Sequence, residues 1–337
     1  MIRSLAIAIF FSISFIINAQ IPEGYYDDAI GLTGDELKTA LHNIIDDHDE
    51  YSYNALRDYI LKESDEDPDN SSNVILIHSG ISRSKSDFGG DPGDWNREHI
   101  WAKSHGDFGN DPPAGTDAHH IRPSDVQING TRGNLDFDNG GNPVNNCPGC
   151  LVDGDSFEPR DEAKGDVARM IFYMAVRYEG GSGEPDLEVV DEVNTYPNPE
   201  HGKLSTLLSW HILDPVDDFE KNRNEVVYTY QQNRNPFIDH PEFVEDVWGD
   251  PTHINNAIDL SVSCYPNPVI DKLTVEHALS SIVEFKLINM SGNVVLTGSA
   301  KPGQSAIDLS SGREGLYLLI LSEINSGKVK QYKILKQ

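Results

Sequence analysis

The sequence predicts an α+β protein in two parts, a mostly helical unit followed by a small all-β domain. Before residue 250, apolar residues recur in several segments at the three- and four-residue spacing of an amphipathic helix. From Leu273 onward, short β-rich runs separated by turn formers replace them. The 337 residues are enough for two domains, and a hydrophobic content of 38% is enough to bury a core.

The first residues predict a secretory signal peptide. Arg3 supplies a positive charge, the run from Leu5 to Ile17 is apolar apart from small serines, and Ala19 is a small residue at a suitable cleavage point. The run is too short to span a membrane comfortably, and no other apolar stretch approaches the ~20 residues that a spanning helix needs. We therefore assign residues 1–19 to the signal, and expect export through the periplasm and no transmembrane segment in the mature protein.

Residues 20–258 are predicted to form the helical unit. Leu37, Leu41, Ile44 and Ile45 recur at helical spacing after Thr33, which is a possible N-cap. Further helices are predicted over residues 53–61, 162–178, 204–211 and 214–231, and a short β-branched strand over 74–78.

Residues 259–337 are predicted to form the β-domain. Its β-rich runs cover residues 272–277, 282–289, 294–297, 306–309, 316–321 and 328–335. Turn formers such as Ser291-Gly292-Asn293 separate them. Short strands with this punctuation predict a small immunoglobulin-like β-sandwich of ~80 residues.

The three cysteines lie in two places. Cys147 and Cys150 are in a loop rich in Asn, Gly and Pro, where they would form a disulfide or half of a zinc knuckle. No second pair exists to complete a zinc knuckle, which favours the disulfide. Cys264 stands alone and is interpreted as structural.

The net charge of −29 argues against tight, non-specific binding to nucleic acid, because phosphate contacts dominate such binding. The excess is local, since residues 259–337 carry eight Lys or Arg against seven Asp or Glu. An acidic surface is still compatible with a site where a bound cation and a few arginines supply local positive potential.

Four polar motifs lie close together between Arg97 and Asn134. They read Arg97-Glu98-His99, Asp117-Ala118-His119-His120, Arg122-Pro123-Ser124-Asp125 and Asn129-Gly130-Thr131-Arg132-Gly133-Asn134. Hydrolysis of a phosphodiester needs a base for water, a cation to neutralise the phosphate and a means to stabilise the leaving oxygen. His99 suits the first role at neutral pH. A carboxylate with an amide oxygen, as in Glu98 and Asn129, suits a hard Mg²⁺ ion.

Two short strands and a helix are predicted around these motifs. Residues 95–101 and 119–121 favour strands, and residues 123–125 favour a helix start with Ser124 as the N-cap. This helix would present Asn129 beside the strands.

Glu98 and His99 are adjacent, and neighbours on a regular strand point to opposite faces. The two side chains can share one site only if the backbone bends or bulges there, or if the site lies at the end of the strand.

Together, these motifs resemble those of the endonuclease I family, a group of secreted bacterial nucleases. The resemblance rests on Asn96-Arg97-Glu98-His99 with Trp101 following, and on the three blocks between Asp117 and Asn134. Later segments also resemble the helical half of that family, namely Trp210-His211, Asp214-Pro215-Val216-Asp217, Arg223-Asn224 and residues 232–239. The resemblance covers residues 23–250 and implies a mostly helical domain around a ββα-metal core.

The resemblance implies roles for individual residues. His99 matches the general base, Glu98 and Asn129 match the metal ligands, and His119 matches a histidine of the second strand that supports the site. One Mg²⁺ ion is the expected cofactor, with Mn²⁺ or Ca²⁺ as alternatives.

The sequence does not decide which of Arg97, Arg122 and Arg132 is the arginine that stabilises the transition state. Arg97 and Asn134 are also expected to contact the substrate.

Members of the family cleave DNA, and often RNA, with little sequence preference. We expect this chain to be a monomer. This chain departs from the family in its acidity and in having at most one disulfide.

The β-domain resembles the C-terminal sorting domain of the type IX secretion system. Cys264-Tyr265-Pro266-Asn267-Pro268 begins it, Gly315-Leu316-Tyr317-Leu318 lies near its end, and a basic run closes it. Tyr196-Pro197-Asn198-Pro199 occurs in mid-chain without a β-rich run after it, so the tetrapeptide alone means little. The resemblance implies that the secretion machinery is a partner and that the protein is secreted or attached to the cell surface.

Two other functions remain as alternatives. One is a zinc-dependent hydrolase that uses His99, His105, His119 and His120, although no HExxH-like spacing supports it. The other is a non-enzymatic surface adhesin in which the β-domain is the working part.

Overall fold

The computed structural model describes residues 21–249 except 182, and residues 262–337 except 278–281, 290–293, 311 and 324–328. The predicted signal peptide and the predicted boundary between residues 258 and 259 lie outside the described residues.

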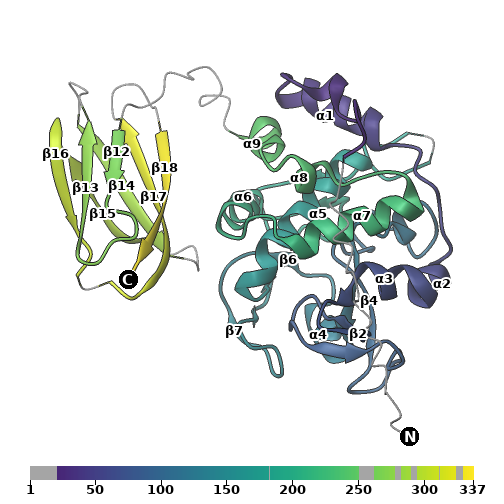
Figure 1. The fold of residues 1–337 in the computed structure, drawn as a ribbon. Helices are drawn as coiled ribbons and strands as arrows, with labels where there is room; N and C mark the ends of the chain where they lie inside the picture. Colours follow the sequence, from purple (N-terminus) through teal and green to yellow (C-terminus); the bar gives the residue numbers. More distant parts are fainter. Residues whose placement is uncertain are drawn as a thin grey trace, which may run out of the picture.

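Helices and short strands alternate through the first part of the chain (Figure 1). The helical elements are η1 (Asp27–Ala29), α1 (Gly34–Ile45), α2 (Tyr53–Ala55), η2 (Leu56–Ile60), α3 (Leu61–Ser64), η3 (Ala114–Thr116), α4 (Val126–Arg132), η4 (Asp161–Ala163), α5 (Lys164–Arg177), α6 (Leu204–Leu213), α7 (Asp218–Gln231), α8 (Pro236–Asp239) and α9 (Phe243–Trp248). The strands are β1 (Glu66–Asp67), β2 (Asn70–Ile75), β3 (Ser82–Ser84), β4 (Trp95–His99), β5 (Ile121–Asp125), β6 (Asp136–Phe137), β7 (Asn142–Pro143), β8 (Leu151–Val152), β9 (Ser156–Glu158), β10 (Glu188–Val189) and β11 (Glu200–His201). They form sheets in the orders β1-β2-β3, β4-β5, β6-β9-β8-β7 and β10-β11.

The predicted helices are confirmed, with shifts at their ends. α1 begins directly after Thr33, and α5 and α6 cover the predicted periodic runs. α7 begins at Asp218 rather than at residue 214, because Asp217 and Glu220 form a reciprocal capping box. The predicted strand over 74–78 is shifted, since β2 ends at Ile75 and His78 lies in the turn that follows.

Helix α5 forms the centre of the helical region, and all of its residues are buried. It contacts α1, α6 and α8 (Figure 1). Val167 and Ile171 of α5 share one hydrophobic cluster with Leu37 and Leu41 of α1. Fully burying such a side chain stabilises the fold by about 1.5–3 kcal/mol. This rigid core carries the shorter elements around it.

Strands β4 and β5 are antiparallel, with Trp95 opposite Asp125 and His99 opposite Ile121. The second strand therefore covers Ile121–Asp125, and the predicted strand over 119–121 is wrong. His119 precedes the strand, in a turn.

Helix α4 begins at Val126, and its N-cap is Asp125 rather than the predicted Ser124. The Asp125 side chain accepts hydrogen bonds from the amides of Gln127 and Ile128. Ser124 is still part of the β4–β5 ladder, so the chain turns into the helix one residue later.

The C-terminal residues form two antiparallel sheets. The strands are β12 (Val262–Tyr265), β13 (Lys272–His277), β14 (Val283–Asn289), β15 (Val294–Ala300), β16 (Gly303–Asp308), β17 (Gly315–Glu323) and β18 (Val329–Lys336). One sheet has the order β12-β13-β16 and the other β15-β14-β17-β18, and side chains of both belong to one hydrophobic cluster. The six predicted runs are confirmed as β13 to β18. β12 is not predicted, because Val262 is its one buried residue and no apolar run marks it.

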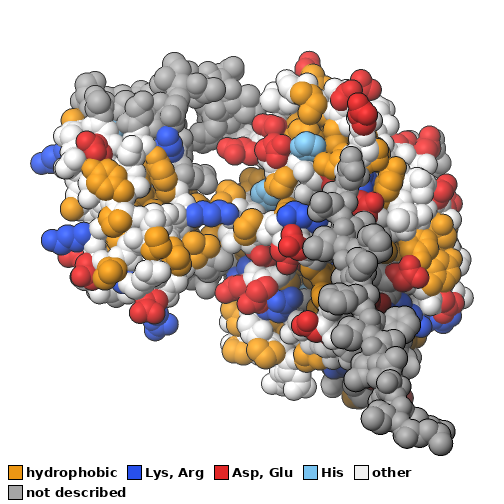
Figure 2. Space-filling view, viewed as in Figure 1, with side chains coloured by type: hydrophobic (Ala, Val, Ile, Leu, Met, Phe, Trp, Pro, Cys, Tyr) orange, Lys and Arg blue, Asp and Glu red, His pale blue; other side chains and the backbone are white. Residues whose placement is uncertain are grey.

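Cys147 and Cys150 form a disulfide, as their loop context favours. Cys264 is a free, partly buried thiol. Among the described residues, no helix combines the length and the apolar character that crossing a membrane requires. Asp and Glu side chains are scattered over the helical region rather than gathered in one patch on the face shown in Figure 2.

Candidate active site

A pocket of about 340 Å³ lies at the end of β4, beside α4. It is lined by Tyr53, Asn96, Arg97, Glu98, His99, Ala102, Lys103, Ser104, Asn129, Arg132 and Gly133. A larger hollow of about 660 Å³ beside α6 and α9 contains none of these residues. Five of the predicted site residues thus line one pocket, whereas Arg122, His119 and Asn134 do not line it.

The ladder between β4 and β5 is regular, with one residue opposite one residue throughout. No bulge separates Glu98 from His99. They are the last two residues of β4, and both line the pocket. The structure therefore has the second predicted arrangement, in which the site lies at the end of the strand.

Glu98 is 1% exposed, and one of its oxygens is engaged. Arg132 Nη1 donates to Oε1 at 3.1 Å, and His78 Nε2 lies 3.5 Å from the same oxygen. Within the described part of the chain, no group donates a hydrogen bond to Oε2. A buried carboxylate needs a compensating charge or donors, so this oxygen is suited to a cation in the pocket.

His99 is held by a carbonyl and two rings. Its ring stacks on Tyr53 at 5.7 Å and lies 5.5 Å from the His120 ring. Nε2 lies 3.2 Å from the Gly115 carbonyl oxygen. Because a carbonyl only accepts, we assign the proton to Nε2, which leaves a lone pair on Nδ1.

The protonation state of His99 follows from its surroundings. Burial, with the nearby His120, lowers the pKa of His99 well below its ordinary value of 6.5. The ring is therefore neutral at neutral pH. Nδ1 makes no hydrogen bond to any described residue, so it is free to accept a proton.

Asn129 is anchored through its amino group. Nδ2 donates to Asn96 Oδ1 at 2.8 Å and to the Arg97 carbonyl oxygen at 3.2 Å. Its Oδ1 has no partner among the described residues. The anchor fixes the amide so that this oxygen remains available as a ligand.

Arg132 and Arg97 line the pocket in different ways. The buried Arg132 guanidinium donates to Glu98, to the His99 carbonyl oxygen at 2.8 Å and to the Ile100 carbonyl oxygen at 2.6 Å. Arg97 is partly exposed, and one of its amino groups donates to the Tyr53 carbonyl oxygen. Arg132 thus holds the end of β4, while most of the Arg97 guanidinium stays free of hydrogen bonds to described residues.

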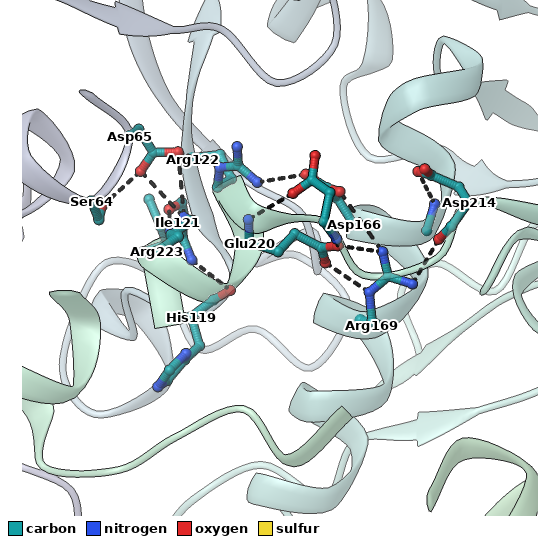
Figure 3. Close-up of polar contacts among 12 residues, drawn as sticks. Ser64, Asp65, His119, Ile121, Arg122, Asp166, Arg169, Asp214, Glu220 and Arg223 are labelled. Atoms are coloured by element: carbon teal, nitrogen blue, oxygen red, sulfur yellow. Dashed lines mark hydrogen bonds and ion pairs between the residues drawn. The ribbon is translucent and has the colours of Figure 1, made fainter. Parts of the chain in front are cut away.

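Arg122 lies directly opposite Glu98 in the ladder, but its side chain belongs to another group of charges. It pairs with Asp65 and, at 3.2 Å, with Asp166, and Arg223 lies 3.3 Å from Asp65. Figure 3 shows this arginine–carboxylate network, which contains Asp65, Arg122, Asp166, Arg169, Glu220 and Arg223. The network joins β5 to α5, α7 and the residue after α3.

The His119 side chain and the Asn134 backbone make contacts elsewhere. His119 Nε2 lies 3.1 Å from the Asn233 carbonyl oxygen, and its ring lies 4.6 Å from Tyr173. Burial lowers the pKa of His119 to about 4. The Asn134 carbonyl oxygen accepts from His105 at 2.8 Å. Of the two adjacent histidines, His120 is the one that contacts His99.

His105, Asp136 and His201 form a buried group whose donor atoms lie within 4.8 Å of one another and could hold a metal ion. These atoms are engaged in protein contacts. His201 lies between Asp136, at 3.3 Å, and Arg132, at 3.1 Å. An ion would have to displace these contacts and approach the charged Arg132, so the pocket beside Glu98 is the more open of the two places for a cation.

Three residues at or beside the pocket are absent from the sequence-based prediction. Asn96 orients Asn129, Tyr53 stacks on His99, and His78 approaches Glu98. The position of Asn96 in the Asn-Arg-Glu-His block is a usable signal. No local signal exists for Tyr53 and His78, because they come from distant segments.

Comparisons with known proteins identify the family. Residues 33–242 match the family described as Endonuclease I, and the chain belongs to this family. Residues 263–337 match the secretion system C-terminal sorting domain. The chain is therefore a secreted or cell-surface nuclease with a type IX sorting domain, from a family that is metal-dependent.

Its relatives include two extracellular ribonucleases. The one from Bacillus subtilis (strain 168) is 59% identical over 225 residues, which is 66% of this chain and 78% of that protein. The one from Bacillus amyloliquefaciens is 59% identical over 227 residues, which is 67% of this chain and 78% of that protein. Endonuclease-1 of Buchnera aphidicola subsp. Acyrthosiphon pisum (strain APS) is 26% identical over 127 residues, or 36% of this chain and 44% of that protein.

Proposed function

We propose that this protein hydrolyses internal phosphodiester bonds of both RNA and DNA with little sequence preference, using one divalent cation. The observation that carries the proposal is the set of atoms without hydrogen-bond partners at the pocket, Glu98 Oε2, Asn129 Oδ1 and His99 Nδ1. The three residues line one pocket, and a concave site with several polar atoms available to a ligand is typical of a binding or catalytic site. The two ribonuclease relatives support RNA as a substrate.

Glu98 and Asn129 are the proposed ligands of the cation. A carboxylate and an amide oxygen fit a hard ion such as Mg²⁺, with Mn²⁺ or Ca²⁺ as replacements. When bound, the ion would neutralise charge on the phosphate and make a coordinated water more acidic. Arg132 holds the other Glu98 oxygen through a hydrogen bond, and His78 Nε2 lies 3.5 Å from it.

His99 is the proposed general base, with Nδ1 accepting a proton from the attacking water. The contact between Nε2 and the Gly115 carbonyl oxygen fixes the tautomer, and Tyr53 and His120 fix the ring plane. A positioned base of this kind contributes about 10²–10⁴-fold to the rate.

Arg97 is the proposed arginine that contacts the phosphate and stabilises the transition state. It lines the pocket and retains free donors, whereas Arg132 is engaged at the end of β4. Arg122 is engaged in the arginine–carboxylate network. We assign Arg122, Arg132 and His119 to the support of the site, and Asn134 to its margin.

We further propose that β4, β5 and α4 form a ββα-metal core and that β12 to β18 form an immunoglobulin-like sandwich. In this proposal residues 1–19 are the signal, 20–258 the nuclease domain and 259–337 the sorting domain, and the mature protein is a monomer. Light scattering of the purified protein tests the monomer.

Digestion of labelled RNA and DNA by the purified mature protein tests the function. Cleavage should occur in Mg²⁺, stop in EDTA and return when Mg²⁺ is restored. Because the proposed nucleophile is water, RNA with 2′-O-methyl groups should be cleaved as well. Failure to cleave any substrate in Mg²⁺, Mn²⁺ or Ca²⁺ would sink the proposal, and activity restored by Zn²⁺ alone would replace it with a zinc hydrolase.

A further inference from the structure

We propose that an aromatic strip beside the pocket binds a single-stranded segment of the nucleic acid by stacking on its bases. The proposal rests on the proposed nuclease function and specifies the form of its substrate. The aromatic strip consists of Tyr51, Tyr53, Tyr59, Phe88 and Tyr230, with Arg57 and Arg97 between them.

The strip begins inside the pocket. Tyr53 lines the pocket and stacks on His99, and the Arg97 guanidinium carbon lies 3.4 Å from the centroid of the Tyr53 ring. The same guanidinium lies 5.2 Å from the Phe88 ring, and that of Arg57 lies 5.5 Å from it. The Arg97 guanidinium therefore contacts both Tyr53 in the pocket and Phe88, and Phe88 also lies near Arg57.

A group of three tyrosines extends the strip. Tyr51 lies 6.4 Å from Tyr59 and 5.9 Å from Tyr230, and Tyr59 and Tyr230 lie 5.7 Å apart between ring centroids. Tyr59 is 39% exposed and shares the η2 segment with Arg57. Tyr51 and Tyr230 pack against the same hydrophobic cluster as Tyr53 and Phe88, which places the tyrosine group beside the same part of the core.

Most rings of the aromatic strip pack against the hydrophobic core. Tyr51, Tyr53, Phe88 and Tyr230 are partly buried against one hydrophobic cluster, which includes the fully buried Trp95. Rings fixed in this way lose little conformational freedom when a ligand binds, which favours binding.

Stacking suits a nuclease of this charge. A net charge of −29 weakens attachment through phosphate contacts, whereas stacking on a base does not depend on the overall charge of the protein. Base faces are open in a single strand and covered in a duplex, and every base has such a face. Guanidinium planes also stack on bases while their charge faces the phosphates. The strip therefore favours single strands of any sequence.

Binding of oligonucleotides by the full-length protein in EDTA, measured by fluorescence anisotropy, tests the strip. The probes are a single strand of about 12 nucleotides, as RNA and as DNA, and a duplex of the same sequence. Tyr59→Ala and Phe88→Ala should each raise the Kd for the single strand about 5- to 150-fold. Tyr59→Trp should retain binding. The matched control is Tyr265→Ala, which removes a tyrosine of similar exposure, 41%, from β12 and should change nothing.

A salt series separates stacking from charge. The slope of log Kd against log salt should stay the same in the aromatic variants and fall by about 0.7 in Arg97→Gln. Arg97 forms no ion pair with a described residue, whereas Arg57 is paired with Asp58 at 2.6 Å. An unchanged single-strand Kd in Tyr59→Ala would overturn the proposal, as would equal losses for single strand and duplex. Because Phe88 packs on Trp95 at 5.0 Å, Tyr59→Ala decides the result if the Phe88 variant unfolds.

The outcomes also separate the strip from the nuclease function. Strip-dependent binding without any hydrolysis in Mg²⁺ would sink the function and leave the strip as a binding surface. If the protein hydrolyses nucleic acid but the aromatic variants bind it with an unchanged Kd, only the proposal for the aromatic strip would be overturned.

Discussion

Glu98 on β4 and Arg122 on β5 face each other across the same ladder, yet they lie in opposite chemical surroundings. Both side chains are 1% exposed. Arg122 sits in a network where its neighbouring charges are paired, with Asp65 and Asp166 on one guanidinium. Glu98 keeps an oxygen that no described residue engages.

The difference separates two uses of a buried charge. Removing one partner of a buried ion pair is costly, because the other charge is left without compensation. Such pairs therefore hold the elements that carry them together. A polar atom without a partner is costly unless a ligand supplies one, and so marks a place where a ligand binds. Substitutions in the pocket should therefore lower activity, whereas substitutions in the arginine–carboxylate network should lower the free energy of unfolding. The four tryptophans all lie between residues 95 and 248, so their fluorescence reports unfolding of the nuclease region alone.

On the pocket side, His99→Ala should lower kcat by ~10²–10⁴-fold, because it removes the group that accepts a proton from water. The urea midpoint of tryptophan fluorescence should stay near that of the wild type. Steady-state cleavage of a labelled oligonucleotide measures the effect, and an unchanged rate would remove His99 from the role of base.

On the network side, Arg122→Ala should lower the free energy of unfolding by about 3–5 kcal/mol, because it leaves Asp65 and Asp166 less compensated in the interior. Urea unfolding followed by tryptophan fluorescence measures this. The control is Lys221→Ala, which breaks an exposed pair with Asp218 and should cost less than about 1 kcal/mol. A large loss of kcat in Arg122→Ala at unchanged stability would return Arg122 to the list of catalytic arginines.

The anchor of Asn129 offers a finer test of the pocket. Asn96→Ala removes the oxygen that accepts from Asn129 Nδ2, and should raise the Mg²⁺ concentration for half-maximal activity about 10–100-fold. Asn96→Asp keeps an acceptor at this position and should raise the Mg²⁺ concentration for half-maximal activity less than Asn96→Ala does. Equal metal dependence in all three proteins would show that the anchor does not orient the ligand.

Lowering the pH should reduce the free energy of unfolding before the paired carboxylates become protonated. Burial lowers the pKa of His119 and His120 to about 4, from about 6.5 in the unfolded chain. Between pH 6.5 and 4 the unfolded chain binds protons that the folded protein does not, so stability falls with pH by about 1.4 kcal/mol per pH unit for each histidine. Urea unfolding at pH 7, 6 and 5 measures the slope. Burial raises the pKa of Glu220 to about 8 and that of Asp214 to about 6, which opposes this slope. The comparison is therefore with His119→Gln, whose slope should be smaller, and equal slopes in the two proteins would contradict burial of a neutral His119 ring.

Much of the site was visible in the sequence because its motifs are short and local. Arg97, Glu98, His99, Asn129 and Arg132 were all predicted, and all line one pocket. The prediction placed the second strand too early, because a strand of five residues inside a run of polar and small residues has no periodicity to mark its ends. The roles of the arginines could not be separated for a related reason, since Arg97, Arg122 and Arg132 have the same chemistry and differ in their partners.

The sequence by itself indicated the family and the sorting domain, through the resemblance of its motifs, and named five residues that line the pocket, because these depend on residues that lie close together in the chain. The tertiary structure decided which charges are paired and which are free. Asp65 and Asp166 pair with Arg122 from distant parts of the chain, and Arg223 pairs in turn with Asp65. Tyr53 and His78 likewise reach the end of β4 from segments that local sequence does not connect to it. Pairing depends on distances of a few ångströms between residues far apart in the chain, and only the packing of α5 and its neighbours sets those distances.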